Sequence, residues 1–458
     1  MADIQTKTTN GHSKHPPEAR PVVSPDAMMS LEQAREEISY ALGLEAYLWG
    51  FPLYSHCNAL TDWLKAGAIG LNTLRRYTRP GDGIAGYGVP DDATIASYAM
   101  FDVTREPVVI HVPYLQDPRW YLVQIDDTFD EVIANIGGMK GPRPGDFVIT
   151  GPGFAGAAPA EMTRIASRTR MGIVTVRIAV AGDFDHGAAL AAQRGFHVLP
   201  LSTYLRDGLG YPPPKPAPVR EPALRGPADL LFFEILGHAL QSYLPDTTDS
   251  LVAAFRAIGL TPGAGFDWRE LDPTTLRGLS RAAKAASQII DQTWEAAGEL
   301  TNGWRYILAS GRTGHDLALR AALAKHASGT ELAAEVIAAR LRIDAADDAL
   351  TGEHKYTLDF PAGQLPPVAA FWNLALHGED MRFVENAIGR YSLGSMSDRL
   401  RVTGDGSLRI LIQHERPAEV TNWLPAPAGP FTLTMRMAGP ASPLLDGSYR
   451  LPAVRRTV

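Results

Sequence analysis

A histidine, a tyrosine and an arginine in the last quarter of the sequence are of the types that move protons and hold anions. His377 follows an apolar run at 369–376, and Arg390 and Tyr391 come a short segment later. An imidazole with an ordinary pKa near 6.5 can accept a proton at neutral pH, and a phenol with a pKa near 10 can donate one. The guanidinium of Arg390 can hold an anion. These residue types predict general acid–base chemistry, provided that His377 faces a cleft and not solvent.

Two pairs of adjacent aspartates supply carboxylates for the same chemistry. Asp91 and Asp92 stand next to each other after Pro90, and Asp126 and Asp127 follow an apolar strand at 121–125. Two half-buried carboxylates can separate their pKa values, so that one serves as acid and the other as base. We take Asp92 and Asp127 as candidate catalytic residues. Because neighbours on a strand point to opposite faces, the alternative for Asp127 is that it caps the next turn.

Aromatic and amide side chains surround the histidine and the arginine along the sequence. The candidate substrate-binding residues are Trp372, Asn373, Asn386, Arg390, Asn422 and Trp423. Apolar rings with a few polar tips are typical of a ligand cleft. The alternative is a β-core in which indoles and amides satisfy buried backbone groups.

Three further segments match chemical motifs only in form. Residues 81–86 read G-x-G-x-x-G, but no buried strand precedes them and no helix follows, so we expect a turn. Glu234 and His238 are four residues apart on an expected helix and lack a third metal ligand. The acidic loop at 183–187 is more typical of a solvated bend than of a metal site. We therefore predict no cofactor: no nucleotide, no flavin and no metal.

Composition limits the partners of this chain. The net charge is -7 and basic residues are scattered, which argues against nucleic acid and against an anionic membrane surface. The sequence has no long apolar run that would span a bilayer, so we predict no membrane. Cys57 is the only cysteine, and no apolar signal-like stretch occurs at the N-terminus. We expect a cytoplasmic protein whose partner is a small-molecule ligand or substrate, and the oligomeric state stays open.

Changes in composition along the 458 residues divide the chain into successive parts. The parts are a disordered tail (1–28), an N-terminal helix plus β-module (29–206), a proline-rich linker (207–227), a helical region (228–345) and a C-terminal β-module (346–458). The expected fold class is α+β: two antiparallel β-sandwich-like modules with a helical region between them. For the first module a distorted barrel is the alternative.

Periodicity and capping residues place the elements. A capping box at 30–33 predicts a helix from 31 that ends at 49, before Gly50-Phe51-Pro52. Further helices are expected at 228–244, 250–258, 273–300, 315–327 and 331–340. Strands are expected at 108–112, 120–125, 147–150, 172–180, 407–414 and 431–437. In the last of these, apolar residues alternate with Thr432, Thr434 and Arg436, which predicts a half-buried strand.

Several segments together resemble one bacterial family, built from an N-terminal and a C-terminal module known as domains of unknown function 1254 and 1214. The C-terminal motifs are LPPVAAFWN at 365–373, Asn386, RYS at 390–392, GDGSL at 404–408 and TNWLPAP at 421–427. The N-terminal motifs are AY at 46–47, PL at 52–53, PV at 107–108, VP at 112–113, Tyr121 and GP at 151–152. The resemblance implies two β-sandwich-like modules with helices between them, and it implies no particular reaction.

The sequence departs from the family pattern at three positions. Ala93 stands where relatives carry a second acidic residue, Met139 lies where an arginine is usual, and His377 replaces a tyrosine. These departures put a polar site shared with the relatives in doubt, and whether they mark a changed site or a specialised substrate stays open. The functional prediction is a cofactor-independent enzyme, a hydrolase, a lyase or a cyclase or isomerase, acting on a small and largely apolar or aromatic metabolite. The alternative is a non-catalytic small-molecule-binding or assembly protein.

Overall fold

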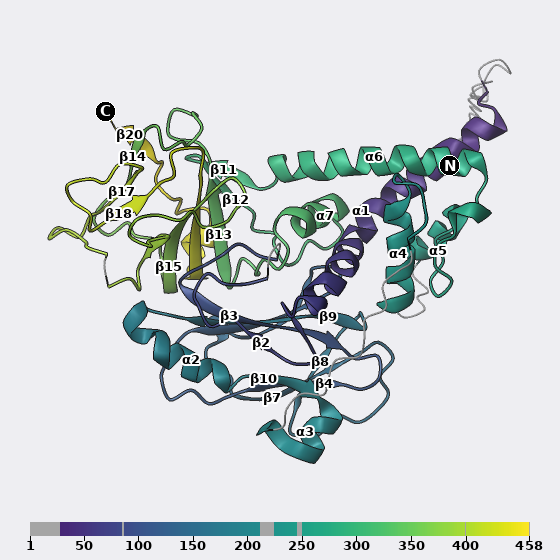
Figure 1. Ribbon diagram of the computed structural model, residues 1–458, viewed down its shortest axis with the longest axis horizontal. Helices are drawn as coiled ribbons and strands as arrows, with labels where there is room; N and C mark the ends of the chain where they lie inside the picture. Colours follow the sequence, from purple (N-terminus) through teal and green to yellow (C-terminus); the bar gives the residue numbers. More distant parts are fainter. Residues whose placement is uncertain (1–27, 85–86, 211–223, 245–249, 399, 458) are drawn as a thin grey trace, which may run out of the picture.

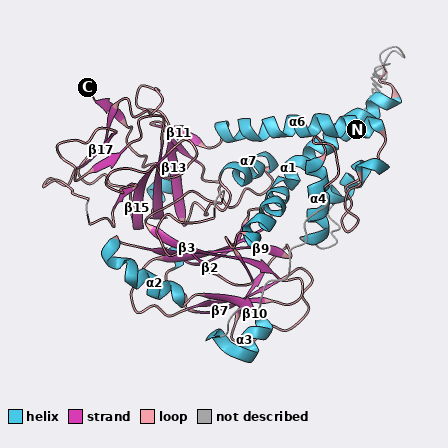
Figure 2. Ribbon diagram, viewed as in Figure 1, coloured by secondary structure: helices cyan, strands magenta, loops and turns pink. Residues whose placement is uncertain are grey.

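The computed structural model describes residues 28–84, 87–210, 224–244, 250–398 and 400–457. Two β-rich modules and one group of helices make up the molecule, and the helices gather on one side of it (Figures 1 and 2). The tail at 1–27 and most of the proline-rich linker, 211–223, lie outside the described residues. Within the described part, no helix is both long and apolar enough to span a bilayer.

The first module is a sandwich of two sheets. The larger sheet contains β1 Gly70–Leu71, β2 Arg75–Arg76, β3 Thr94–Asp102, β5 Tyr121–Asp127, β6 Val132–Gly137 and β9 Met171–Ala179. The smaller sheet contains β4 Val108–Val112, β7 Gly145–Thr150, β8 Thr163–Ala166 and β10 His197–Pro200. The strand orders are β1-β3-β9-β5-β6, with β2 paired to β3, and β10-β4-β7-β8. Its connections carry α2 His186–Arg194, α3 Leu201–Asp207, η2 Gly138–Lys140, η3 Asp183–Asp185 and η4 Gly208–Gly210.

The central strand β3 is buried on both faces, and its side chains alternate between two cores. Ile95 and Phe101 point into the interior of the sandwich. Tyr98 and Met100 point the other way, into the helical core. A strand covered on both faces needs apolar residues at nearly every position, and β3 has them because helices cover its outer face.

The helical group packs on the outer face of the larger sheet (Figure 1). Its elements are α1 Leu31–Lys65, α4 Leu231–Ser242, α5 Ser250–Ala254, η5 Phe255–Ile258, η6 Trp268–Glu270, α6 Pro273–Ala296 and α7 Leu317–His326. Helix α6 begins at an aspartate cap: the Asp272 carboxylate accepts from the backbone N–H groups of Thr274 and Thr275.

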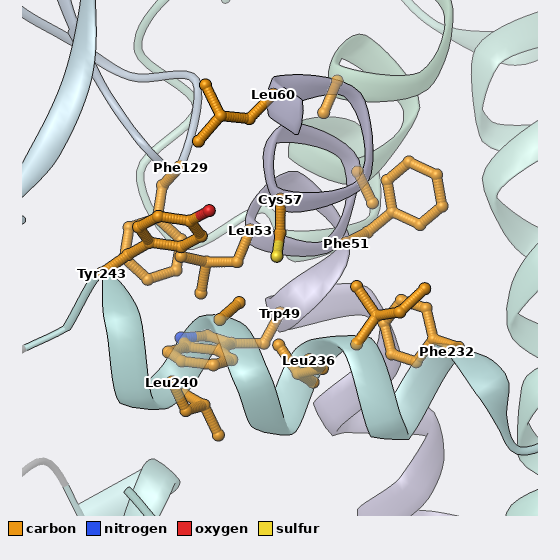
Figure 3. Packing of buried hydrophobic residues seen from close by; sticks show 14 of the residues in the cluster. Trp49, Phe51, Leu53, Cys57, Leu60, Phe129, Phe232, Leu236, Leu240 and Tyr243 are labelled. Atoms are coloured by element: carbon orange, nitrogen blue, oxygen red, sulfur yellow. The ribbon is translucent and has the colours of Figure 1, made fainter. Parts of the chain in front are cut away.

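Helix α1 is longer than expected, because it continues through Gly50-Phe51-Pro52 to Lys65. A proline inside a helix removes one backbone hydrogen bond and costs roughly 3 kcal/mol. Packing offsets this cost: a Cβ on Gly50 would lie 2.6 Å from Leu236 Cδ1, so α1 and α4 are in close contact there. Figure 3 shows Leu53 and Cys57, beyond the proline, within the same buried cluster. The prediction that the helix ends at 49 is therefore wrong.

The second module has a six-stranded and a four-stranded sheet. The six-stranded sheet contains β11 Glu299–Thr301, β12 Trp304–Tyr306, β13 Val336–Leu341, β15 Val368–His377, β16 Ser392–Gly394 and β19 Thr432–Pro440. The four-stranded sheet contains β14 Lys355–Phe360, β17 Leu408–Gln413, β18 Trp423–Pro425 and β20 Arg455–Thr457, and α8 Ser442–Asp446 follows β19. The orders are β11-β12-β13-β19-β15-β16 and β18-β17-β14-β20.

The predicted fold class is confirmed: two β-sandwich modules, with mostly antiparallel pairing and helices between them. The first module is a sandwich of two separate sheets and not a distorted barrel. Pairing is parallel between β1 and β3, between β7 and β8, and between β17 and β18.

Two local predictions for the second module are wrong. Residues 331–340 were expected to be helical, but β13 begins at Val336 and pairs along its length with β19. Its alternate residues Ile337, Ala339 and Leu341 enter the module core, so strand periodicity governs this alanine-rich segment. Strand β19 was expected to be half-buried, yet every residue in it is buried. Its polar side faces the first module and not solvent.

Candidate functional site at the module junction

The two modules meet through a small apolar contact. Ala93 and Ala179 of the first module pack against Phe371 and Ala438 of the second. The ring of Trp120 meets that of Phe371 edge to face, with centroids 5.4 Å apart. This contact fixes the walls of the cavities on either side of it.

A cavity of about 460 Å³ lies between the modules. Predicted residues from both modules line it: Asp92, Trp372, Asn373, Arg390 and Tyr391. Strands β15 and β16 bring the C-terminal residues together, because Asn373 pairs with Gly394 and Ala375 with Ser392. Asp92 arrives from the other module, just before β3. We call this space the junction cavity.

Asp92 is the carboxylate at the polar end of the junction cavity. Its Oδ1 accepts hydrogen bonds from the Ser392 hydroxyl and from Asn373 Nδ2, the latter at 3.1 Å. Burial raises the pKa of Asp92 to about 6, although both hydrogen bonds favour the charged form. A carboxyl group with this pKa exchanges protons near neutral pH, which is the property that a general base requires.

Asn373 joins the two adjacent aspartates. Its Nδ2 lies 3.2 Å from Asp91 Oδ1 as well as 3.1 Å from Asp92 Oδ1. Asp91 also accepts from the Ala93 backbone N–H and the Thr94 hydroxyl, both at 3.1 Å, and lies 3.3 Å from Arg436 Nε. Asp91 is therefore a structural carboxylate, whereas Asp92 opens onto the cavity.

Tyr391 lines the junction cavity beside a stack of rings. Its hydroxyl donates to Glu385 Oε2 at 3.0 Å. Its ring stacks on Phe383 at 5.0 Å, and Phe383 in turn stacks on His377 at 5.1 Å. Partial burial and the Glu385 carboxylate raise the pKa of Tyr391, so its hydroxyl stays protonated at neutral pH.

Four of the predicted binding residues hold backbone segments. Arg390 Nη1 donates to the carbonyls of Val420, Thr421 and Trp423 at 2.7–3.2 Å. Asn386 bonds the backbone at Val384, Ile388 and Arg390. Asn422 bonds the backbone at Arg401 and Arg409, and the Trp423 indole donates to the Gln413 carbonyl at 2.9 Å. Of the four, Arg390 also lines the junction cavity.

His377 is fully buried at the end of β15, so a solvent-facing position is wrong. Its Nε2 donates to the Pro90 carbonyl at 3.1 Å, and Nδ1 accepts from the Thr434 hydroxyl at 3.4 Å. It does not line the junction cavity. Burial lowers the pKa of His377 to about 4, so the ring is neutral at physiological pH.

The buried imidazole predicts a pH-dependent stability. The pKa of His377 is near 4 in the folded chain and about 6.5 in the unfolded chain. Between these two pH values the unfolded chain binds a proton at this residue and the folded chain does not. The free energy of unfolding therefore falls as the pH drops from 6.5 towards 4. For His377 this amounts to about 2 kcal/mol between pH 7 and pH 5. We expect that loss, measured by urea denaturation, to be absent in His377→Gln and retained in His414→Gln, a change at an exposed histidine. An equal loss in all three proteins would contradict the assignment.

Asp127 lies at the other end of the sheet from Asp92. The register pairs Thr94 with Ala179 on one side of β9 and Asp127 with Gly172 on the other, which separates the two aspartates by roughly 23 Å along the strands. Asp127 Oδ1 accepts from the backbone N–H groups of Phe129 and Glu131 at 2.8 and 3.3 Å, and Oδ2 bonds Arg168 Nε. This geometry is that of a turn cap.

A chain of buried charges beside the cavity was not predicted from the sequence. Arg177 Nε lies 2.8 Å from Glu331 Oε1, and Arg436 Nη2 lies 2.5 Å from the same oxygen. Arg436 continues the chain to Asp91. The one available signal was Arg436 within the alternating pattern of β19, where it was taken as solvent-facing. The alternation is real, but the polar face is covered by the first module.

Acidic residues in the two segments that only weakly resemble metal sites bind protein groups in the structure. Glu234 accepts from the backbone N–H groups of Arg225 and Gly226. Asp185, in the acidic loop, pairs with Arg119 at 2.7 Å. In the ranges that the structure describes, no group of three or more His, Cys, Asp or Glu side chains is arranged to hold a metal ion.

Comparisons place this geometry among known proteins. Residues 71–200 match the family described as a protein of unknown function, DUF1254, and residues 335–442 match the one described as DUF1214.

The crystal structure of the VPA0106 protein from Vibrio parahaemolyticus is similar at a TM-score of 0.71 and 19% identity, covering 92% of this chain and 100% of that one. A putative uncharacterized protein from Burkholderia cenocepacia gives a TM-score of 0.44 at 14% identity, over 93% and 95% of the two chains. No curated protein matches at a significant level. With both modules matched in order along the chain, this protein belongs to the two-module DUF1254–DUF1214 family.

Proposed function

We propose that this protein is an enzyme that uses general acid–base chemistry on a small metabolite in the junction cavity, with Asp92 as the proton acceptor. The observation that carries the proposal is the position of the Asp92 carboxylate: it lines a cavity of about 460 Å³ and is held there by Ser392 and Asn373 of the opposite module. Both partners donate to the carboxylate, which stabilises the charged form that accepts a proton.

The lining of the junction cavity supports a substrate with an apolar or aromatic part. Val180, Trp372, Ile388 and Met396 form its apolar surface. Ser392 and Asn373 meet at Asp92, so a bound molecule would place its reactive C–H or O–H group there and its apolar part against the apolar residues. Asp183, His186 and Asp398 add polar groups elsewhere in the lining. Apolar walls together with polar groups that orient a ligand are typical of metabolite sites.

Asp92 as the base and a neighbouring neutral phenol fit reactions that move one proton. The Tyr391 hydroxyl stays protonated and lines the same cavity. To stabilise a developing oxyanion it would turn to the substrate the hydrogen bond that it donates to Glu385 in the free protein. An isomerase or a lyase needs no more than this pair, whereas a hydrolase needs a bound water in addition. We propose the cofactor-independent isomerase or lyase class first and the hydrolase class second.

A non-catalytic binding protein is the second candidate function. It is favoured by the hydrogen bonds that Arg390 makes to backbone carbonyls, because a guanidinium held in this way is a rigid wall and not a mobile clamp. Such a protein would retain its ligand unchanged.

The setting of the protein is part of the proposal. A reducing, cytoplasmic compartment suits the lone thiol of Cys57, which is buried. The net charge of -7 supports a small molecule as the partner in preference to nucleic acid.

The two functions separate in one incubation. Purified protein is mixed with a metabolite extract, and the extract is compared by mass spectrometry before and after. We expect one compound to fall by many equivalents per chain while a product of the same or a fragment mass rises. Depletion that stops at one equivalent, with the compound recovered intact after denaturation, would favour the binding protein.

A further inference from the structure

We infer that a second cavity, on the far side of the Asp91–Asp92 pair, binds a small aromatic carboxylate with Arg177 and Tyr98 as its anion-binding floor. This cavity has a volume of about 580 Å³ and lies between residues 81–84 and 87–91, the larger sheet of the first module, the end of α7 and the loop at 380–383. We call it the arginine cavity. Asp92 does not line it, so the inference is independent of the function proposed above.

Arg177 ends the buried chain of charges at this cavity. The chain alternates in sign from Asp91 through Arg436 and Glu331 to Arg177. Glu331 takes the Nε side of the Arg177 guanidinium at 2.8 Å, and Arg177 lines the cavity although it is 6% exposed. Arg177 also donates a hydrogen bond to the Tyr98 hydroxyl. A carboxylate in the cavity would continue the alternation of charge by accepting from Arg177 and from the Tyr98 hydroxyl.

Tyr98 gives the floor a second donor. Burial raises the pKa of Tyr98, and the Arg177 guanidinium beside it opposes that shift without reversing it. Its hydroxyl therefore stays protonated and can donate to an anion. A guanidinium together with a phenol hydroxyl is a combination suited to a carboxylate and less suited to a cation.

Gly81 and Gly83 of the G-x-G-x-x-G segment, and Gly88 beyond it, line the wall above this floor. A Cβ on Gly83 would lie 3.1 Å from the Tyr98 hydroxyl oxygen, and one on Gly88 would lie 3.6 Å from Arg177 Nη2. A Cβ on Gly81 would lie 2.6 Å from the ring of Phe383. Residues 85–86 are outside the described part. Gly81 and Gly88 have φ angles of +83° and +74°, which favour glycine whatever the space. Gly83 has no such constraint, so a side chain there would be limited by the Tyr98 hydroxyl, which gives this glycine a role unrelated to nucleotide binding.

Aromatic rings set the class of the ligand's apolar part. Tyr87 and Tyr98 meet edge to face, with centroids 5.9 Å apart, and Phe383 lines the same cavity beside Gly81. Three aromatic rings in the lining favour a planar aromatic group.

The nearby carboxyl groups do not oppose an anion at the floor. Asp91 is paired with Arg436. Asp126 lies behind Tyr87, and burial raises its pKa well above the usual range, which favours the uncharged carboxyl. The mouth carries both signs, with Asp82 and Asp380 beside Lys325 and Arg382.

The test uses benzoate as the probe, with benzamide and benzylamine as neutral and cationic relatives of the same size. Binding to the full-length protein is followed by saturation-transfer NMR and calorimetry. We expect saturable benzoate binding below about 10 mM and at least about tenfold weaker binding of the two relatives. Gly83→Val, which adds methyl groups over Tyr98 without touching an ion pair, should abolish benzoate binding, and Tyr98→Phe should weaken it. Asp92→Asn, in the other cavity, should leave it unchanged.

Three outcomes would contradict a carboxylate site in the arginine cavity, and a fourth would place that site in the other cavity. Equal binding of benzoate and benzamide, or benzoate binding that survives Gly83→Val in a folded protein, would overturn the inference, as would the absence of saturable binding to the wild type. A loss of benzoate binding in Asp92→Asn alone would move the anion to the junction cavity. Failure of turnover in the extract experiment would leave the benzoate result standing, so the two proposals fail separately.

Discussion

Replacement of Asp92 by asparagine is expected to lower turnover by about a hundredfold or more, because a general base contributes roughly 10²–10⁴-fold to a rate. The amide keeps the shape of the side chain and an oxygen that can accept from Ser392. The folded protein should be as stable as the wild type at pH 7, or more so. Burial raises the pKa of Asp92 above its unfolded value, so the charged carboxylate opposes folding at neutral pH.

The pH profile identifies the role of the carboxylate. As a base, Asp92 is active when ionised, so kcat/KM should fall below about pH 6. Ser392→Ala removes a hydrogen bond that lowers the pKa of Asp92, and should move this limb to higher pH. Asp359→Asn, a matched change in β14 away from the cavity, should leave both rate and profile unchanged. Wild-type activity in Asp92→Asn would remove the carboxylate from the mechanism and favour the binding protein.

Sequence reasoning located one half of the junction cavity, for a physical reason. Trp372, Asn373, Arg390 and Tyr391 lie on or beside two strands that pair as neighbours, so their nearness follows from local strand and turn patterns. Asp92 reaches the same cavity from the other module. No spacing of residues along the chain predicts that Asp92 comes close to β15 and β16. The family motif indicated that the segment around Asp92 was of interest, but its position in space depends on how the two modules pack.

The lack of information about spatial neighbours also explains why sequence patterns gave some residues roles that differ from those in the structure. An asparagine that lines a cavity and one that bonds a loop backbone have the same sequence signature, so Asn373 and Asn422 could not be told apart before their partners were known. Helix α1 passes Pro52 because buried contacts on α4 outweigh a local penalty. Propensity describes a segment in isolation, and these segments are not isolated.

Buried charge is the feature that sequence patterns represent least well. Arg177, Glu331 and Arg436 lie on three different segments of the chain. The local sequence around each of them is typical of an ordinary surface residue. Their burial follows from the meeting of three parts of the chain: the sheet of the first module, the segment after α7 and strand β19. The cost of removing each charge from water is met by its partners, so the group is stable only as a whole.

Glu331→Gln should therefore be among the most destabilising single changes in this protein. The carboxylate accepts from two guanidinium groups, and its loss leaves Arg177 and Arg436 buried with one negative partner, Asp91, between them. Breaking a buried ion pair from one side costs about 3–5 kcal/mol. We expect a fall of that size in the free energy of unfolding at pH 7, measured by guanidinium chloride denaturation. Glu415→Gln, which removes an exposed pair with Lys355, should leave the denaturation midpoint unchanged.

The pH dependence of this loss gives a further check with a definite sign. The two arginines lower the pKa of Glu331 to about 2, against an unfolded value of about 4.3. A carboxylate with a depressed pKa stabilises the fold fully above its unfolded value and loses that contribution as the pH falls through the folded one. The stability difference between wild type and Glu331→Gln should thus be constant above about pH 5 and shrink towards pH 2. A difference that persists unchanged at pH 2 would assign the effect to packing and not to charge, and the alternating chain that positions Arg177 would lose its electrostatic basis.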